Sequence, residues 1–264
     1  MATIDFSETS AIVVGGGSGI GAATTLLLSE LGSSVAIFDI NAVAASGIAD
    51  QVRNGRCEPY EVDVSHETEL QAAVAAVVER RGAINFLVNC AASFIAAGRD
   101  ATKRDWDQAL GVNIRGCASS VSAVSRHMPP GSAIVNLSSI SAHIAQPNRW
   151  TYNATKAAIV EMTKCQALDL APLGIRVNAV SPGWIWTPEV EKAANGDRKR
   201  WEAVWGKFHI LGRLGEPGEV ANAIAFLLSP SASFITATEL MVDGGYLALS
   251  AEGSGQESRF ASSH

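Results

Sequence analysis

Residues 10–39 read SAIVVGGGSGIGAATTLLLSELGSSVAIFD, and this stretch decides the fold. An apolar strand over residues 10–14 runs into a glycine-rich turn over 15–21, and a helix follows over 22–31. Gly32 ends that helix, and a second strand over 34–39 ends at Asp39. Glycines at such a turn let the backbone approach a pyrophosphate, whose charge is stabilised by the helix N-terminus. The order of strand, glycine-rich turn, helix and acid-ended strand therefore predicts a dinucleotide site.

Asp39 determines which dinucleotide we expect. A carboxylate at the end of the second strand accepts hydrogen bonds from the adenosine ribose hydroxyls and repels a 2′-phosphate. The glycine-rich turn and the residues directly after Asp39 contain no Arg or Lys that would offset this repulsion. We therefore expect NAD rather than NADP as the cofactor.

The alternation of strands and helices continues along the rest of the chain. Further strands are predicted over residues 57–62, 84–89, 132–138, 175–180 and 239–243, with helices over 43–52, 67–81, 103–127, 152–171 and 217–228. Residues 189–212 are charged and weakly periodic, which is typical of a mobile lid. The predicted fold class is α/β, a doubly wound, mostly parallel, seven-stranded sheet in a single domain over residues 1–249. The Ser- and Gly-rich segment 250–264 is expected to be a flexible tail.

The composition excludes several classes of protein. A net charge of −6 argues against a nucleic-acid or anionic-membrane partner. No apolar stretch reaches the roughly 18 residues of a membrane-spanning helix, and the N-terminal residues lack the apolar region of a secretory signal. The four cysteines show no paired spacing and the five histidines are scattered, so we expect no disulfide framework and no metal site. These features together indicate a cytoplasmic protein.

A second stretch, residues 139–156, carries the candidate chemistry. Ser139 follows the predicted strand 132–138, while Tyr152 and Lys156 stand four residues apart on the next helix and share one of its faces. The intervening loop should bring the Ser139 hydroxyl to the phenol. A free tyrosine has a pKa of roughly 10, and a nearby ammonium group lowers it. We therefore expect Tyr152 to exchange a proton with an alcohol or carbonyl oxygen that Ser139 holds.

With these two stretches, residues 8–246 closely resemble the short-chain dehydrogenase/reductase family, which has a Rossmann-like fold. Ser139, Tyr152 and Lys156 match the family's catalytic set, and Asn113 matches the fourth member, which implies that it positions a water linking Lys156 to solvent. The resemblance further implies that the cofactor is bound by Gly15, Ser18, Gly19, Ile20, Asp39, Asp63, Val64, Asn89, Ala91, Tyr152, Lys156, Pro182, Gly183, Ile185 and Thr187. It implies an NAD-dependent enzyme that interconverts a secondary alcohol and a ketone by hydride transfer, and a homotetramer.

The sequence defines the substrate less closely than it defines the cofactor and the reaction. The planar guanidinium of Arg149 can bind both oxygens of a substrate carboxylate. An Arg that is simply exposed to solvent explains this residue equally well. With Trp150, His143 and Trp184 as further candidate substrate residues, we expect a sugar or a keto-deoxy sugar acid. The alternative is a hydrophobic alcohol, such as a cyclic or aromatic diol, a steroid or a 3-oxoacyl compound. A non-catalytic nucleotide-sensing protein on the same fold is the alternative from another class, but the intact Ser, Tyr, Lys and Asn set favours an enzyme.

Overall fold

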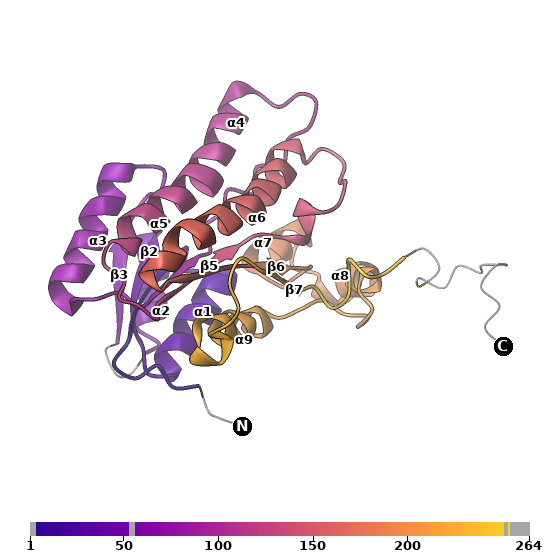
Figure 1. Ribbon diagram of the computed structural model, residues 1–264. Helices are drawn as coiled ribbons and strands as arrows, with labels where there is room; N and C mark the ends of the chain where they lie inside the picture. The colour runs from indigo at the N-terminus through magenta and orange to yellow at the C-terminus, as the bar shows by residue number, and fades with distance from the viewer. Residues whose placement is uncertain (1–3, 53–55, 251–252, 254–264) are drawn as a thin grey trace.

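The computed structural model describes residues 4–52, 56–250 and 253. Within these residues seven strands form one sheet in the order β3-β2-β1-β4-β5-β6-β7, and each neighbouring pair is parallel (Figure 1). The strands are β1 (Ser10–Val14), β2 (Ser34–Asp39), β3 (Cys57–Glu61), β4 (Phe86–Asn89), β5 (Ala133–Leu137), β6 (Arg176–Pro182) and β7 (Glu239–Val242). The doubly wound, seven-stranded, single-domain fold predicted from the sequence is confirmed.

Helices cover both faces of this sheet. The helices are α1 (Gly19–Glu30), α2 (Ala42–Ala49), α3 (Glu67–Arg81), α4 (Lys103–Leu110), α5 (Cys117–Ser125), α6 (Trp150–Leu170), α7 (Pro188–Ala193), α8 (Arg198–Trp205) and α9 (Pro217–Leu228). Side chains of β1 alternate between the two faces, as a strand in a two-sided sheet requires. Ala11 and Val13 join a core with α1 and α9, while Ile12 and Val14 join a core with α3, α5 and α6 (Figure 1).

The two edges of the sheet differ in sequence. At one edge, β3 contains Pro59, which has no backbone N–H. The backbone of Arg56 and Val62 bonds to β2, so the alternation along a strand turns the backbone of Pro59 toward the free edge. At the other edge, β7 has the sequence ELMV, with three apolar residues after Glu239, and pairs only with β6 among the described strands.

The predicted long helix over 103–127 is wrong in one respect. The chain forms α4, then a π-helical segment, η1 (Gly111–Gly116), and then α5. Two contacts with distant parts of the sequence accompany the wider turn. Gly116 lies against Val64, where a Cβ atom would come within 2.8 Å of a Val64 methyl carbon. Asn113, in the same segment, turns its side chain inward to bond Ser93 and Thr155. Such π-helical turns are frequent at functional sites.

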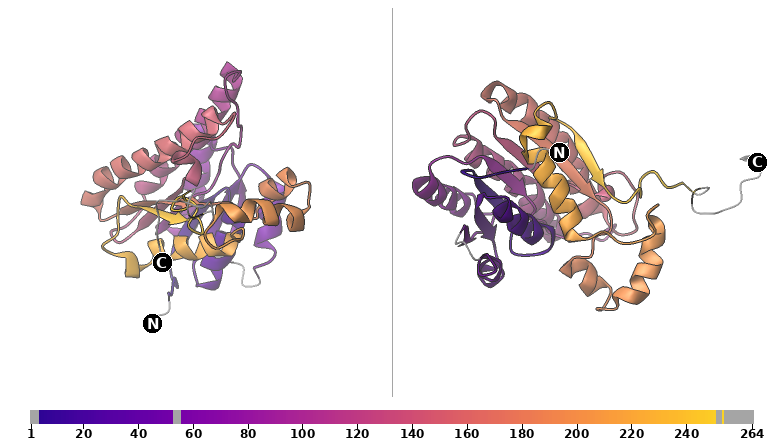
Figure 2. Two further views of the ribbon diagram at one scale, coloured as in Figure 1. Left: turned by 90° about the vertical axis from the view of Figure 1, so that its right-hand side faces the viewer. Right: turned by 90° about the horizontal axis from the view of Figure 1, so that it is seen from below.

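The predicted lid, residues 189–212, contains α7 and α8, which project from the body of the sheet (Figure 2). The tail predicted over residues 250–264 lies outside the described residues, except for Ser250 and Gly253. Among the described helices, none combines the length and the apolar character needed to cross a membrane.

Candidate active site

The candidate site lies at the carboxyl ends of the central parallel strands, where the strand order reverses between β1 and β4. This is the crevice in which open α/β sheets bind their ligands. Two adjoining pockets occupy it, with volumes of about 390 and 290 Å³. We call the larger one the cofactor pocket and the smaller one the substrate pocket. Their shared wall includes Ile20, Cys90, Phe94, Leu137 and Glu189.

The glycine-rich turn gives the cofactor pocket its shape. Gly15 has a φ of +75°, and a Cβ atom there would lie 2.6 Å from the backbone nitrogen of Ala91. A Cβ atom on Gly21 would overlap the carbonyl oxygen of Gly15. The turn can therefore pack this closely against β4 only with glycines. It delivers the chain to the start of α1, where the N-cap Ser18 and the first helical residues line the pocket, and the N-terminus of a helix favours a negatively charged group.

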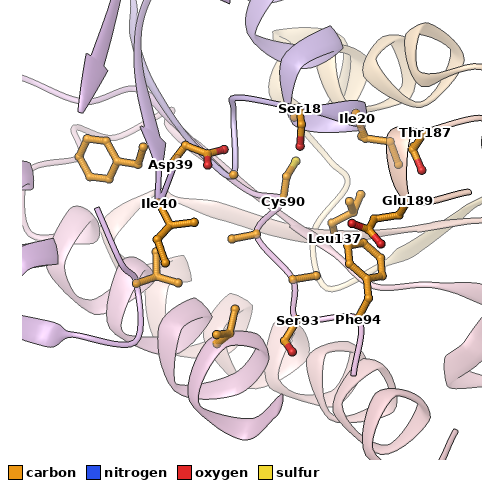
Figure 3. A pocket seen from close by; sticks show the side chains of 18 of the residues that line it. Ser18, Ile20, Asp39, Ile40, Cys90, Ser93, Phe94, Leu137, Thr187 and Glu189 are labelled. Carbon is orange, nitrogen blue, oxygen red and sulfur yellow. The ribbon is translucent and has the colours of Figure 1, made fainter. Parts of the chain in front are cut away.

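Asp39 lies at the far end of this pocket beside Ile40, with Leu137, Phe94 and Glu189 at the other end (Figure 3). One carboxylate oxygen of Asp39 accepts the Gly17 N–H at 2.9 Å, and the other accepts the Asn41 N–H at 2.9 Å. No Lys or Arg is among the described residues that line the pocket. A ligand group next to Asp39 therefore meets a fixed negative charge with no cation nearby.

Of the other expected cofactor residues, most line one pocket or the other. The cofactor pocket includes Ser18, Gly19, Ile20, Asp63, Val64, Ala91 and Thr187, and the substrate pocket includes Pro182, Gly183 and Ile185. Asn89 is different, because its side chain is buried and donates from Nδ2 to Asn136 Oδ1 at 2.9 Å. Asn89 therefore braces β4 against β5 instead of facing either pocket.

Ser139, Tyr152 and Lys156 meet in the substrate pocket. Ser139 follows β5 and caps a short turn, with its hydroxyl accepting the Ser141 N–H at 3.1 Å. Tyr152 and Lys156 lie in the first part of α6, and the Lys156 ammonium is 5.6 Å from the centroid of the Tyr152 ring. Lys156 is buried and donates from Nζ to the Leu137 carbonyl at 2.8 Å.

The electrostatics of these groups differ from the sequence-based expectation. Burial raises the pKa of Tyr152 to about 12, while the hydrogen bond with Ser139 and the charge of Arg149 act in the opposite direction. Burial also lowers the pKa of Lys156 to about 8. The expected lowering of the Tyr152 pKa by Lys156 is therefore not seen, because desolvation of the phenol is the larger effect and the ammonium is bonded to the Leu137 carbonyl.

Asn113 joins the loop after β4 to α6. Its Oδ1 accepts the Ser93 N–H at 2.7 Å, and its Nδ2 donates to the Ser93 carbonyl at 3.1 Å and to Thr155 Oγ1 at 2.9 Å. Asn113 lines neither of the two large pockets. Its side chain fixes Ser93 and Thr155 relative to each other, which also fixes Tyr152 and Lys156 on either side of Thr155.

Arg149 and Trp184 line the substrate pocket, but His143 and Trp150 do not. His143 instead points to β7, where its Nε2 lies 2.8 Å from Glu239 Oε1. Trp150 is 57% exposed, because the first turn of α6 turns its side chain away from the pocket. The structure therefore brings Arg149 and Trp184 together with Ser139, Tyr152 and Lys156, but not His143 or Trp150.

Sequence reasoning missed several residues of this pocket. They are mostly apolar and come from the loop after β4, the turn after β5 and the lid: Phe94, Ile140, Gln146, Glu189, Val190 and Ala193. Phe94 stacks on Tyr152, with ring centroids 5.8 Å apart. Its position directly after the end of a central strand was the available signal, since ligand-binding residues gather there.

Trp184 connects the substrate pocket to the lid. Its ring stacks on Trp205 of α8 at 4.7 Å, and Trp205 stacks on Trp201 at 4.5 Å. Buried His209 joins the same elements, because Nε2 accepts the Trp184 N–H and Nδ1 donates to the Trp205 carbonyl, each at 3.2 Å. The lid therefore packs on the loop after β6 through aromatic rings and one histidine.

Comparisons with known proteins agree with this arrangement. Residues 15–247 match the family model described as enoyl-(acyl carrier protein) reductase. The chain is 35% identical over 247 residues to a cyclohexanol dehydrogenase from Acinetobacter sp. (strain SE19), covering 91% of this chain and 96% of the relative. It is 37% identical over 250 residues to a cis-4-hydroxycyclohexanecarboxylate dehydrogenase from Sinomonas cyclohexanicum, covering 92% and 98%. The solved structure of an aldohexose dehydrogenase from Thermoplasma acidophilum superposes with a TM-score of 0.86 at 32% identity, covering 95% and 98%.

Proposed function

Because this chain belongs to the short-chain dehydrogenase/reductase family, we propose that it is an NAD-dependent oxidoreductase that interconverts a small cyclic secondary alcohol and its ketone. The observation that carries this proposal is the meeting of Ser139, Tyr152 and Lys156 in a pocket that shares a wall with the pocket of the glycine-rich turn and Asp39. A protein that only senses a nucleotide has no use for an acid–base group in a second pocket.

The residues of the cofactor pocket fit a dinucleotide. The glycine cradle leaves room that a side chain would fill, and the start of α1 offers N–H groups to a pyrophosphate. A bound nicotinamide cofactor supplies the site that accepts or donates the hydride. Asp39 favours NAD, because its carboxylate suits ribose hydroxyls and repels a 2′-phosphate.

The chain's own residues handle the proton and the reacting oxygen. In the oxidation direction Tyr152 removes the proton from the alcohol, and in reduction it returns one to the carbonyl oxygen. Ser139 holds that oxygen by a hydrogen bond. Lys156, buried one helical turn from Tyr152, places a positive charge 5.6 Å from the centroid of the phenol ring, and such a charge favours the phenolate although desolvation of the phenol is the larger effect on its pKa. Asn113 keeps the helix that carries both groups in place.

The size and lining of the substrate pocket favour a compact ring. Its volume of about 290 Å³ is at the lower end of ligand pockets, which begin at roughly 300 Å³. Away from the catalytic groups its wall includes the apolar Phe94, Ile140, Trp184 and Val190, with polar groups at Gln146, Arg149 and Glu189. A polyhydroxylated sugar would place part of its hydroxyls against the apolar side chains without partners, which costs free energy. We therefore favour the cyclic alcohol over the sugar acid expected from the sequence, and two relatives that are named for cyclohexane-ring substrates support this choice.

The test is a panel of alcohols assayed for NADH formation. It should contain cyclohexanol, cyclopentanol, glucose, gluconate and linear 2-alkanols at equal concentrations. We expect the cyclic alcohols to give the highest kcat/KM. Highest activity on the sugars would overturn the substrate class, and NAD binding without turnover of any alcohol or ketone would leave the nucleotide-sensing alternative.

A further inference from the structure

Arg149 is a cation in the substrate pocket without an anionic partner. Its side chain is half-buried and lines the pocket. Across the described residues, its guanidinium forms no ion pair and no hydrogen bond, whereas Arg176, Arg198 and Arg213 each bond to carbonyls or carboxylates. The guanidinium lies over the Tyr152 ring, whose centroid is 5.9 Å from the guanidinium carbon. A guanidinium that faces a largely apolar pocket leaves its five donors available to a ligand.

The position of Arg149 is fixed by its surroundings. It is the N-cap of α6, and the next residue but one, Thr151, ties the helix start to the loop after β4. Thr151 Oγ1 donates to the Ile95 carbonyl at 2.6 Å and accepts the Ala97 N–H at 3.1 Å. On the other side, Asn153 Nδ2 donates to the Ile144 carbonyl at 2.9 Å. The backbone that carries Arg149 is therefore held on both sides, as a binding residue requires.

The spacing from the reacting oxygen defines what Arg149 can bind. It precedes Tyr152 by three residues, which is roughly 4.5 Å along a helix axis. A substrate whose oxygen lies at Tyr152 would place a group a few bonds away at the guanidinium. Resting on the function proposed above, we propose that Arg149 binds a carboxylate on the ring, so that the preferred substrate is a cyclic secondary alcohol with a carboxylate across from the carbinol carbon. The planar fork of Arg matches a carboxylate in a two-bond arrangement.

Glu189 is an acidic side chain in the same pocket that could pair with Arg149. It is the acid that lines this pocket, and it also lines the cofactor pocket. Figure 3 shows it with Phe94 and Leu137 at the shared wall. Among the described ion pairs none joins Glu189 to Arg149. The competing explanation is that Arg149 exists to pair with Glu189 when the lid moves, in which case the charge of the substrate would be irrelevant.

The test compares a charged ligand with an uncharged one of the same shape. Turnover is measured with 4-hydroxycyclohexanecarboxylate and with its primary amide. Binding is measured separately, by the tryptophan fluorescence of the pocket, with cyclohexanecarboxylate and cyclohexanecarboxamide, which cannot be oxidised at a carbinol. We expect Arg149→Gln to lower kcat/KM and affinity for the acid by about 10- to 150-fold, the range for a charge-assisted hydrogen bond. The amide should change by less than about threefold, and Arg149→Lys should restore part of the loss.

Two controls make the result specific. Arg126→Gln removes the same charge from an exposed site after α5, near the amino ends of the central strands, and should leave both ligands unaffected. Glu189→Gln should leave acid binding unchanged or strengthen it, because a like charge is removed. Equal losses for acid and amide in Arg149→Gln, or a parallel loss in Glu189→Gln, would overturn the inference. Arg149-dependent acid binding without turnover would retain the inference and reject the proposed function, and charge-independent turnover of cyclic alcohols would do the reverse.

Discussion

At the scale of single residues, the proton-transfer group can be separated from the cofactor. The Tyr152 phenol lies in the substrate pocket and is not among the residues that line the cofactor pocket. We predict that Tyr152→Phe lowers kcat by about 10²- to 10⁴-fold, the usual contribution of a general acid or base, while the Kd for NAD stays nearly the same. Steady-state assays give kcat, and fluorescence titration with NAD gives the Kd.

The matched control for this change is Tyr60→Phe. Tyr60 is half-buried on β3 and its hydroxyl bonds Glu58 at 3.2 Å, away from both pockets. It should leave kcat and the Kd for NAD unchanged. A loss of NAD affinity in Tyr152→Phe that matches the loss of rate would contradict this separation of roles.

Cofactor choice is also a property of one residue. We predict that the unmodified protein prefers NAD to NADP by more than about tenfold, which corresponds to roughly 1.4 kcal/mol. Asp39→Ala should narrow the gap mainly by admitting NADP, since it removes the charge that repels a 2′-phosphate. Steady-state kcat/KM with each cofactor gives the ratio, and Asp63→Ala, at another acid of the same pocket, should not change it. Equal use of both cofactors by the unmodified protein would contradict the role of Asp39.

The residues that sequence reasoning located best are those with strict local requirements. Gly15, Asp39, Tyr152 and Lys156 each follow from a turn, a strand end or a helical spacing, and the structure places all four in the two pockets. The Tyr152 pKa was mispredicted because desolvation depends on everything packed around the phenol, which the spacing of two residues does not reveal. His143 was misplaced for a similar reason, since its partner, Glu239, is distant in the sequence.

At the scale of elements, the lid depends on the protonation state of His209. Its Nε2 accepts the Trp184 N–H, so the ring must be neutral there. Burial is the largest effect on its pKa and lowers it, while Asp243 raises it and Arg213 lowers it. Since the unfolded chain has the higher His pKa, of about 6.5, the stability from neutral His209 is complete above that pH. It is lost as the pH falls from there through the lowered pKa of the folded state.

We therefore predict that His209→Asn reduces the fall of the melting temperature between pH 7 and pH 5. The variant cannot titrate in this range, although it should melt at a lower temperature than the unmodified protein at pH 7. Thermal unfolding followed by circular dichroism at several pH values provides the measurement. His127→Asn, at an exposed histidine after α5, is the control, and it should keep the original slope. If His209→Asn leaves the fall of the melting temperature between pH 7 and pH 5 unchanged, other groups cause that fall.

The helices and strands themselves were largely predictable, because each has its own pattern of apolar residues and its own start and stop residues. Short apolar runs between helices predicted all seven strands, to within two residues at their ends. The break between α4 and α5 was not predictable in this way. It depends on Gly116 packing against Val64 and on Asn113 reaching Ser93, and both contacts join segments that are far apart in the sequence.

At the scale of the whole molecule, exposed apolar side chains predict self-association. Ala157 and Ala158 lie exposed on α6, a surface on which small residues permit close helix packing, and Leu168 on the same helix is 76% exposed. We predict a homotetramer, with a mass by light scattering at micromolar concentration of about four times the chain mass of 27.6 kDa. Ala158→Arg should reduce this mass, because a long charged side chain separates the packed helices. Ala72→Arg on the exposed face of α3 should not, and a monomeric mass for the unmodified protein would refute the prediction.

The difference between the two sheet edges, β3 and β7, determines whether copies of the chain can add to one another without limit by strand pairing. Pro59 withholds a donor from the outer side of β3, so another strand cannot add there by regular pairing. Among the described strands only β7 then offers a free edge. Two copies that pair through β7 are related by a two-fold axis, so each copy occupies the other's free edge. Growth by this route ends at a pair, whereas two open edges would permit an endless ribbon. Pro59 thus prevents further copies from adding at the β3 edge. Replacing it with a β-branched residue, as in Pro59→Val, should favour filaments over discrete particles in electron micrographs.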